Sequence, residues 1–258
     1  RHGYYANVSY FDHWLGRRVA TLEQTDQLDN TVVIVTSDHG DMLGDRGVWF
    51  KMSFHERSAR VPLVMAGPGV AASTVPNVCS HLDLLPTLLD IASEGDEAPD
   101  RPRLADLPGR SLWPAATGGT DNVDETTGEY TAEMASHPMF MIRRGRFKYI
   151  HCDVDPPLLF DLEADPLERS NLCSEPEHAD LAADFAAEVA RRWDSDAIRD
   201  RVIASQRSRR VVDAAMTTGR EVSWDHLPIN DVANSYVRNN SDWDEVGANF
   251  RYPRIERP

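Results

Sequence analysis

The polar segment Ser37-Asp38-His39-Gly40-Asp41 follows directly on an apolar run and carries the side chains best suited to chemistry. A carboxylate and an imidazole can both bind a divalent cation, and the turn that Gly40 permits would let Asp38 and His39 share one. In the simpler alternative, Asp38 caps the next turn and His39 forms a local hydrogen bond. The pair by itself leaves both interpretations open.

A lysine further along the chain could complete such a site. Lys51 stands between Phe50 and Met52. A lysine among apolar neighbours close to a metal could bind an anionic group, whereas a lysine stem covering apolar surface, with its ammonium in water, is the more frequent arrangement. The same loop carries three more residues that could be ligands, but that pair with one another in the more common case: His55, Glu56 and Arg60.

The residues before the polar segment predict the strand that positions it. Residues 31–36 are β-branched and do not alternate, which is typical of a strand buried on both faces and commonly parallel and central. Open α/β sheets place their sites just past the carboxyl ends of such strands. The other predicted elements are a helix over 4–24, a loop over 42–60, a strand over 61–66, a helix capped by Asp83, a loop over 93–125, a hairpin over 139–151, a strand over 158–162, and helices over 176–192 and 195–217.

The order of these elements predicts an α/β protein with three parts. Residues 1–125 alternate strands and helices around the predicted metal strand. Residues 126–218 read as a small α+β subdomain with an antiparallel hairpin and helices. Residues 219–258 have no clear period but are rich in aromatic residues, so we expect an extended tail that lies on another surface.

The composition limits what the protein can bind. The chain has 258 residues, 27 basic and 42 acidic, with a formal net charge of −15. That acidity argues against a nucleic-acid binder or a protein of anionic membranes, because both need a basic face, and no apolar run approaches the roughly 20 residues of a membrane helix. Cys79, Cys152 and Cys173 form no CxxC pair, which favours a reducing compartment, and we expect a cytoplasmic protein.

Three stretches form a specific combination. The first is residues 31–66, with Asp38-His39-Gly40, then Lys51, then the run 58–64; the second is the helix at 83–89; the third is residues 160–172, which contain Phe160-Asp161-Leu162, Asp165-Pro166, Glu168 and Asn171-Leu172. Together they resemble the sulfatase branch of the alkaline-phosphatase superfamily. Further stretches resemble choline sulfatases in particular: residues 49–54, 141–151 and 193–210, and in the tail Asn239, Asp242 and 250–253.

The resemblance implies an alkaline-phosphatase-like parallel-sheet sandwich that hydrolyses a sulfate ester, choline sulfate in the first instance. The family's nucleophile is a formylglycine made from a Cys/Ser-x-Pro/Ala-x-Arg motif, and a divalent cation polarises the sulfate oxygens. By resemblance, Asp38 and His39 are metal ligands and Lys51 is a catalytic residue that contacts the sulfate. Calcium is the family's usual metal, while the imidazole ligand makes manganese or zinc conceivable.

The chain departs from the family pattern at the nucleophile. None of its cysteines begins the motif, and the paired aspartates near a sulfatase's amino terminus are also missing. We therefore expect the carboxyl-terminal half of a sulfatase, whose partner is the amino-terminal half and which is inactive alone. Two alternatives stay open: a phosphonate monoester or phosphodiester hydrolase of the same superfamily, and a noncatalytic module that oligomerises.

The tail carries a possible site for choline. Trp243 stands between Asp242 and Asp244. A quaternary ammonium has no N–H donor, so aromatic faces and carboxylates hold it. In choline sulfatases the tail is thought to reach a neighbouring protomer, and Asp242 best matches the family's tail acid. The resemblance thus predicts a homo-oligomer with Asp242 in substrate binding; otherwise Trp243 only anchors the tail.

Overall fold

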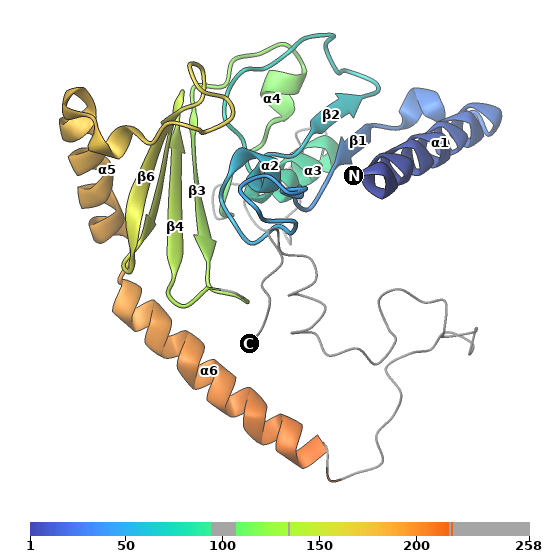
Figure 1. The fold of residues 1–258 in the computed structure, drawn as a ribbon. Coiled ribbons are helices and arrows are strands. Elements are labelled where there is room, and N and C mark those ends of the chain that lie inside the picture. The colour runs from blue at the N-terminus through green and yellow to red at the C-terminus, as the bar shows by residue number, and fades with distance from the viewer. Residues whose placement is uncertain (94–106, 134, 217, 219–258) are drawn as a thin grey trace.

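The structure is a computed structural model that describes residues 1–93, 107–133, 135–216 and 218 (Figure 1). The tail with Asp242 and its neighbours lies outside the described residues. The described part forms a two-stranded sheet, of order β1-β2, and a four-stranded sheet, of order β3-β4-β5-β6. The first sheet comes from the amino-terminal half of the chain and the second from the carboxyl-terminal half.

The amino-terminal part contains the predicted helix and the two predicted strands. Its elements are α1 (His2–Gln24), β1 (Val33–Thr36), α2 (Glu56–Ala59), β2 (Leu63–Ala66), α3 (Leu84–Ser93) and α4 (Trp113–Ala116), with short 3-10 turns at Leu28–Asn30 and His81–Asp83. Two predicted loops were wrong in part. The loop over 42–60 contains α2, and the loop over 93–125 contains α4, in which Pro114 occupies the first turn, where its missing N–H costs little.

The direction of strand pairing differs from the expectation. We expected a parallel neighbour for residues 31–36, but β1 pairs antiparallel with β2, with Val33 opposite Ala66 and Thr36 opposite Leu63. All four residues of β1 are half-buried rather than fully buried. A β-branched run without alternation indicates that both faces of the strand are apolar; parallel strands commonly show this, but an antiparallel strand covered on both faces shows it too.

The four-stranded sheet is an antiparallel meander. Its strands are β3 (Glu125–Tyr130), β4 (Met139–Arg144), β5 (Phe147–Cys152) and β6 (Asp155–Asp161). The predicted hairpin is confirmed as β4 and β5. The sequence did not predict β3, because its run Glu-Thr-Thr-Gly-Glu-Tyr shows no apolar alternation. Its Gly128 has a packing reason, since a Cβ there would lie 2.6 Å from the ring of Phe54.

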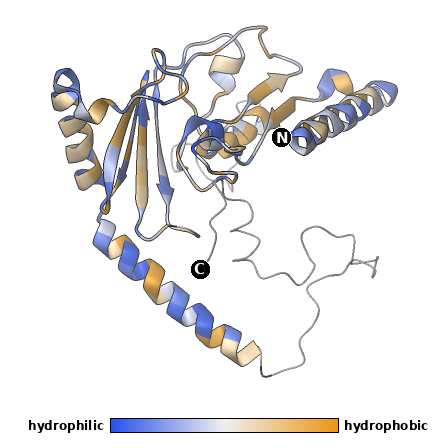
Figure 2. Cartoon of the chain, viewed as in Figure 1, coloured by the Kyte–Doolittle hydropathy of each residue, from blue (hydrophilic) through white to orange (hydrophobic). Residues whose placement is uncertain are grey.

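Both faces of this sheet are covered. Successive side chains of a strand point to opposite faces, and consecutive residues of β4 and β5 are buried. On one face, Phe140, Ile142, Tyr149 and Leu159 pack against α5 (Ala179–Arg192), which contributes Phe185 and Val189. On the other face, Met141, Ile150 and Phe160 pack against Phe54, which the loop before α2 supplies. Figure 2 shows hydrophobic residues along these strands, and both hydrophobic and hydrophilic residues on α5. The second face therefore joins the sheet to the amino-terminal part of the chain.

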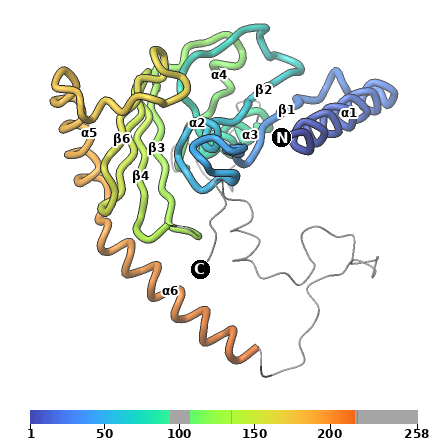
Figure 3. The backbone as a smooth tube through the Cα atoms, in the orientation of Figure 1, coloured from blue at the N-terminus to red at the C-terminus, as the bar shows by residue number. Residues whose placement is uncertain are grey.

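Helix α6 (Ser195–Met216) extends away from the sheet, and none of its residues is buried (Figures 1 and 3). It matches the predicted helix over 195–217. Among the described residues, no helix combines the length and the apolar character that crossing a bilayer requires.

Candidate active site at the end of β1

The polar segment after β1 is held by the backbone of α2. The Gly40 N–H donates to the Ser58 carbonyl at 2.8 Å. A Cβ on residue 40 would lie 2.1 Å from the Arg57 carbonyl oxygen, so only glycine fits there. The glycine in Asp38-His39-Gly40 is therefore required by the close approach of two backbones, and it fixes where the preceding two side chains lie.

The loop after Gly40 folds back on itself and returns Lys51 to the site. The Met42 N–H donates to the Phe50 carbonyl at 3.0 Å, and the Gly44 N–H donates to the Val48 carbonyl at 2.8 Å. Gly47 turns the chain with a φ of 74°. Figure 3 follows the backbone from β1 through this loop to α2. Residues far apart along the loop thus become neighbours.

The predicted site residues of this segment come together in the structure. Lys51 Nζ lies 2.9 Å from His39 Nε2, and Asp38 Oδ2 lies 3.4 Å from the same nitrogen. His39 Nδ1 lies 2.9 Å from the Gly40 carbonyl oxygen, which can only accept. This contact assigns the ring proton to Nδ1 and leaves the Nε2 lone pair facing Lys51 and Asp38.

Asp38 is a carboxylate that stays ionised and accessible. Its Oδ1 accepts from the His39 N–H at 2.9 Å, and this hydrogen bond lowers the pKa of the carboxyl group. The side chain is 83% exposed. The local hydrogen bonds of the simpler alternative are therefore present, but they use Oδ1 and Nδ1, while Oδ2 faces Nε2 and Nε2 contacts the Lys51 ammonium.

Asp38 Oδ2 and His39 Nε2 fit a divalent cation by their chemistry, and a cation bound to Nε2 would replace its contact with the Lys51 ammonium. A carboxylate oxygen and an imidazole nitrogen are both accepted by calcium, manganese or zinc, with preferences that differ between the metals. Within the ranges that the structure describes, no group of three or more His, Cys, Asp or Glu side chains could hold a metal. Asp38 and His39 are thus a pair of ligands that needs further ligands from elsewhere.

The three other charged residues of the loop pair differently from the prediction. Arg60 does lie 4.0 Å from Glu56. His55, however, pairs with Glu168 at 3.3 Å, and Glu56 pairs with Lys148 at 2.9 Å. Both new partners belong to the carboxyl-terminal part, so the loop is tied to the four-stranded sheet.

Ser58, which no sequence pattern marked as functional, links the loop to the site. It is 3% exposed, its carbonyl accepts from Gly40, and its hydroxyl donates to the Lys51 carbonyl. No local signal could have found it, because a serine in a polar loop is ordinarily exposed.

The residues of the stretch 160–172 have definable structural roles. Asp161 pairs with Arg146 and accepts from the N–H groups of Glu163 and Ala164, which caps a turn. Asn171 Oδ1 accepts from the Leu159 N–H at 3.0 Å and closes the segment onto β6. The turn presents Glu168, whose φ of 54° is uncommon for a residue with a Cβ.

Comparison with known proteins identifies the family. Residues 1–94 match the sulfatase family model, and residues 200–252 match the model of the choline sulfatase carboxyl terminus. A choline-sulfatase from Rhizobium meliloti is 43% identical over 99% of this chain and 50% of its own length. The chain belongs to the sulfatase family. Asp38, His39 and Lys51 all lie within residues 1–94, the stretch that matches the sulfatase model.

Other sulfatase relatives match a shorter part of the chain. Arylsulfatase K from Rattus norvegicus is 36% identical over 67% of this chain and 31% of its own length. The crystal structure of a phosphonate monoester hydrolase from Agrobacterium radiobacter is 31% identical, with a TM-score of 0.61 over 72% of this chain and 40% of that one. The predicted alkaline-phosphatase-like fold class is thereby confirmed. The chain spans about half the length of the choline-sulfatase and about a third of arylsulfatase K.

Proposed function

We propose that this chain supplies the metal-ligand and lysine portion of a sulfatase active site that hydrolyses choline sulfate. The observation that carries the proposal is the convergence of Lys51 Nζ and Asp38 Oδ2 on His39 Nε2, within 3.4 Å, at the end of β1. An ammonium beside two ligand atoms can stabilise the negative charge of a sulfate group. The similarity to choline-sulfatase over 99% of the chain supports the choice of substrate.

In this proposal each side chain has one task. Asp38 and His39 would hold a divalent cation, calcium in the first instance, and such a cation withdraws electron density from the sulfate oxygens when bound. The Nδ1–H bond to the Gly40 carbonyl keeps the His39 ring oriented, so that Nε2 serves as the ligand atom. Lys51 contacts a sulfate oxygen through its ammonium and stabilises the charge that develops as the ester bond breaks.

We propose that the nucleophile comes from outside this sequence. No cysteine here begins the Cys/Ser-x-Pro/Ala-x-Arg motif, and the chain spans half of its choline-sulfatase relative. Residues 195–199 fit the serine form of the motif, but Ser195 begins α6 and its hydroxyl donates to Asp153, and no contact of the described residues joins it to Lys51 or His39. We propose that an amino-terminal sulfatase half, bearing the formylglycine and further metal ligands, completes the site. A hard divalent cation takes six or more oxygen-type ligands, so two ligands alone would bind it weakly.

Purified chain without that half is expected to show no turnover of choline sulfate, because the formylglycine is lacking and Asp38 and His39 alone would bind the metal weakly. Joined to the amino-terminal half of a choline-sulfatase, with its cysteine converted, the chain is expected to hydrolyse choline sulfate when calcium is present. Sulfate release measures both. Metal-dependent turnover by the chain alone would overturn the proposal.

A second candidate function is hydrolysis of a phosphonate monoester, which the match to a phosphonate monoester hydrolase structure favours. A phenylphosphonate monoester in place of choline sulfate tests this candidate.

The tail is expected to select for the ammonium group of choline. We propose a homo-oligomer in which Asp242 of one protomer faces the choline of the next, supported by the family-model match over 200–252. In the completed enzyme, Asp242→Asn should raise KM for choline sulfate by roughly tenfold, which corresponds to about 1.4 kcal/mol, and leave KM for an uncharged aryl sulfate unchanged, because a carboxylate attracts only the charged substrate group. Equal changes for both substrates would contradict an ammonium contact.

A further inference from the structure

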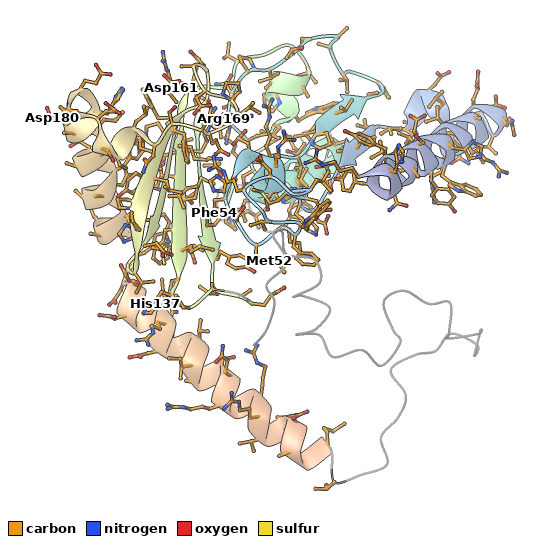
Figure 4. The ribbon with its side chains drawn as sticks, in the orientation of Figure 1. Met52, Phe54, His137, Asp161, Arg169 and Asp180 are labelled. Carbon is orange, nitrogen blue, oxygen red and sulfur yellow. The ribbon has the colours of Figure 1, made fainter. Side chains whose placement is uncertain are left out.

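A buried group of charges, which we call the Lys148 cluster, lies between the four-stranded sheet and α2. Its members are Lys148, Glu168, Glu56 and His55, with Lys148 1% and Glu168 3% exposed. The Lys148 ammonium contacts the Phe54 carbonyl at 2.7 Å, Glu56 Oε1 at 2.9 Å and the Glu168 carboxylate. Two of the ammonium's three N–H donors have hydrogen-bond acceptors in Phe54 and Glu56, and the Glu168 carboxylate is its buried ion-pair partner. Figure 4 shows Phe54 at the side of the sheet that faces α2.

Glu168 forms hydrogen bonds and ion pairs with residues from several separate segments of the chain. Its Oε2 accepts from the Glu56 N–H at 2.8 Å, and its backbone carbonyl accepts from the Arg46 guanidinium. Burial would raise the pKa of Glu168, but His55, Lys148 and the Glu56 N–H together lower that pKa to about 2. The carboxylate is therefore charged, and it holds His55 and the start of α2, while the Glu168 backbone carbonyl holds Arg46 of the loop that carries Lys51.

A continuous set of contacts leads from Glu168 to the candidate active site. Glu56 is the first residue of α2, and Ser58 lies in the same short helix. The Ser58 carbonyl accepts from the Gly40 N–H, next to His39, and its hydroxyl donates to the Lys51 carbonyl. A shift of α2 would therefore displace the backbone on both sides of the contact between His39 and Lys51.

We infer that Glu168 is a positioning residue, which holds His39 and Lys51 in place through α2 and Ser58. It lies more than a hundred positions along the chain from α2. Its hydrogen bonds and ion pairs among the described residues are with His55, Glu56, Lys148 and Arg46, and not with His39 or Lys51. A buried charge cluster of this kind is stable only when every member has its partner, so it favours one arrangement of α2 over displaced ones. The effect of Glu168 on catalysis rests on the proposed function, whereas its effect on the position of α2 does not.

Hydrogen exchange of the full chain tests the structural consequence. In Glu168→Gln the amide of Gly40 is expected to exchange roughly tenfold faster or more, because its acceptor on α2 is less restrained. The amides of Ile142 and Tyr149, in the centre of the sheet, should keep their rates. The matched control is Glu163→Gln, an exposed carboxylate near the same turn, which should leave Gly40 unchanged.

Two results would overturn the inference. One is an unchanged Gly40 rate in Glu168→Gln; the other is acceleration of Gly40 and of the sheet amides by the same factor, which would mean a general loss of stability. If Glu168→Gln alone does not fold, the double variant Glu168→Gln/Lys148→Met also removes the unpaired ammonium. The same comparison of Gly40 with Ile142 and Tyr149 then decides.

Turnover of the completed enzyme tests the catalytic consequence separately. Glu168→Gln is expected to lower kcat by roughly 10–100-fold with KM changed little, because misplacement of a catalytic group affects the chemical step. An unchanged kcat together with a faster Gly40 amide would overturn the catalytic role of Glu168. If the wild-type completed enzyme turns over no sulfate ester, the proposed function fails, and the exchange of Gly40 still decides whether Glu168 positions α2.

Discussion

Replacement of Lys51 by alanine in the completed enzyme is expected to lower kcat for a sulfate ester by about a hundredfold. One charge contact made in the transition state is commonly worth roughly 3 kcal/mol. Lys51 is exposed, and its ammonium lies 2.9 Å from His39 Nε2, so its removal should cost little stability. Steady-state kinetics and thermal unfolding of the same preparations measure the two effects.

The control for this prediction separates the charge of Lys51 from its stem. Lys51→Met keeps an unbranched apolar side chain and loses the ammonium. If Lys51 mainly covers apolar surface, as the more frequent arrangement would have it, the methionine variant should retain wild-type turnover. We expect the methionine and alanine variants to lose turnover to a similar extent.

Asp38→Ala and His39→Ala are each expected to remove measurable binding of calcium and manganese by the completed enzyme without unfolding it. Loss of an outer-shell partner alone typically costs roughly 10–100-fold in metal affinity, and loss of a direct ligand should exceed that. Both residues follow β1 in an exposed or half-buried segment, so neither contributes to a core. Calorimetric titration with each metal measures the affinity.

A carboxylate elsewhere on the surface serves as the control for the metal prediction. Asp29→Ala removes an exposed acid from the turn after α1 and should leave both affinities unchanged. The assignment of Asp38 and His39 as ligands fails if the two variants bind calcium and manganese as the wild type does. It also fails if the Asp29 variant loses affinity to the same degree, since the effect would then be one of net charge.

The elements that the sequence predicted well are those with a clear period or a local turn signal. The helix over 4–24 and the hairpin over 139–151 correspond to α1 and to β4 with β5. The polar segment after the apolar run likewise marked the end of β1. These features depend on neighbours along the chain, which a single sequence displays directly.

The features that the sequence did not predict depend on contacts between distant residues. Helix α2 has four residues and no periodicity, and it begins where the Glu56 N–H meets the carboxylate of Glu168. Lys148 and Glu168 are charged residues, which are ordinarily exposed, so their burial could not be expected from composition. The antiparallel pairing of β1 with β2 was missed because an apolar run favours a parallel neighbour only as a tendency, and the pairing itself depends on residues about thirty positions apart.

The meander of β3 to β6 has a consequence for the order of folding. Each strand pairs with its neighbour in the sequence, and β4 and β5 are joined by a two-residue turn at 145–146. Closing such short loops costs little chain entropy, and contacts of this local kind form fast. Lys148 meets Glu56 only across 92 positions, so that loop closes at a greater entropic cost. The sheet should therefore assemble first and serve as the template on which the segment with Lys51 and His39 docks, which makes the candidate site at the end of β1 the late-folding region of the described chain.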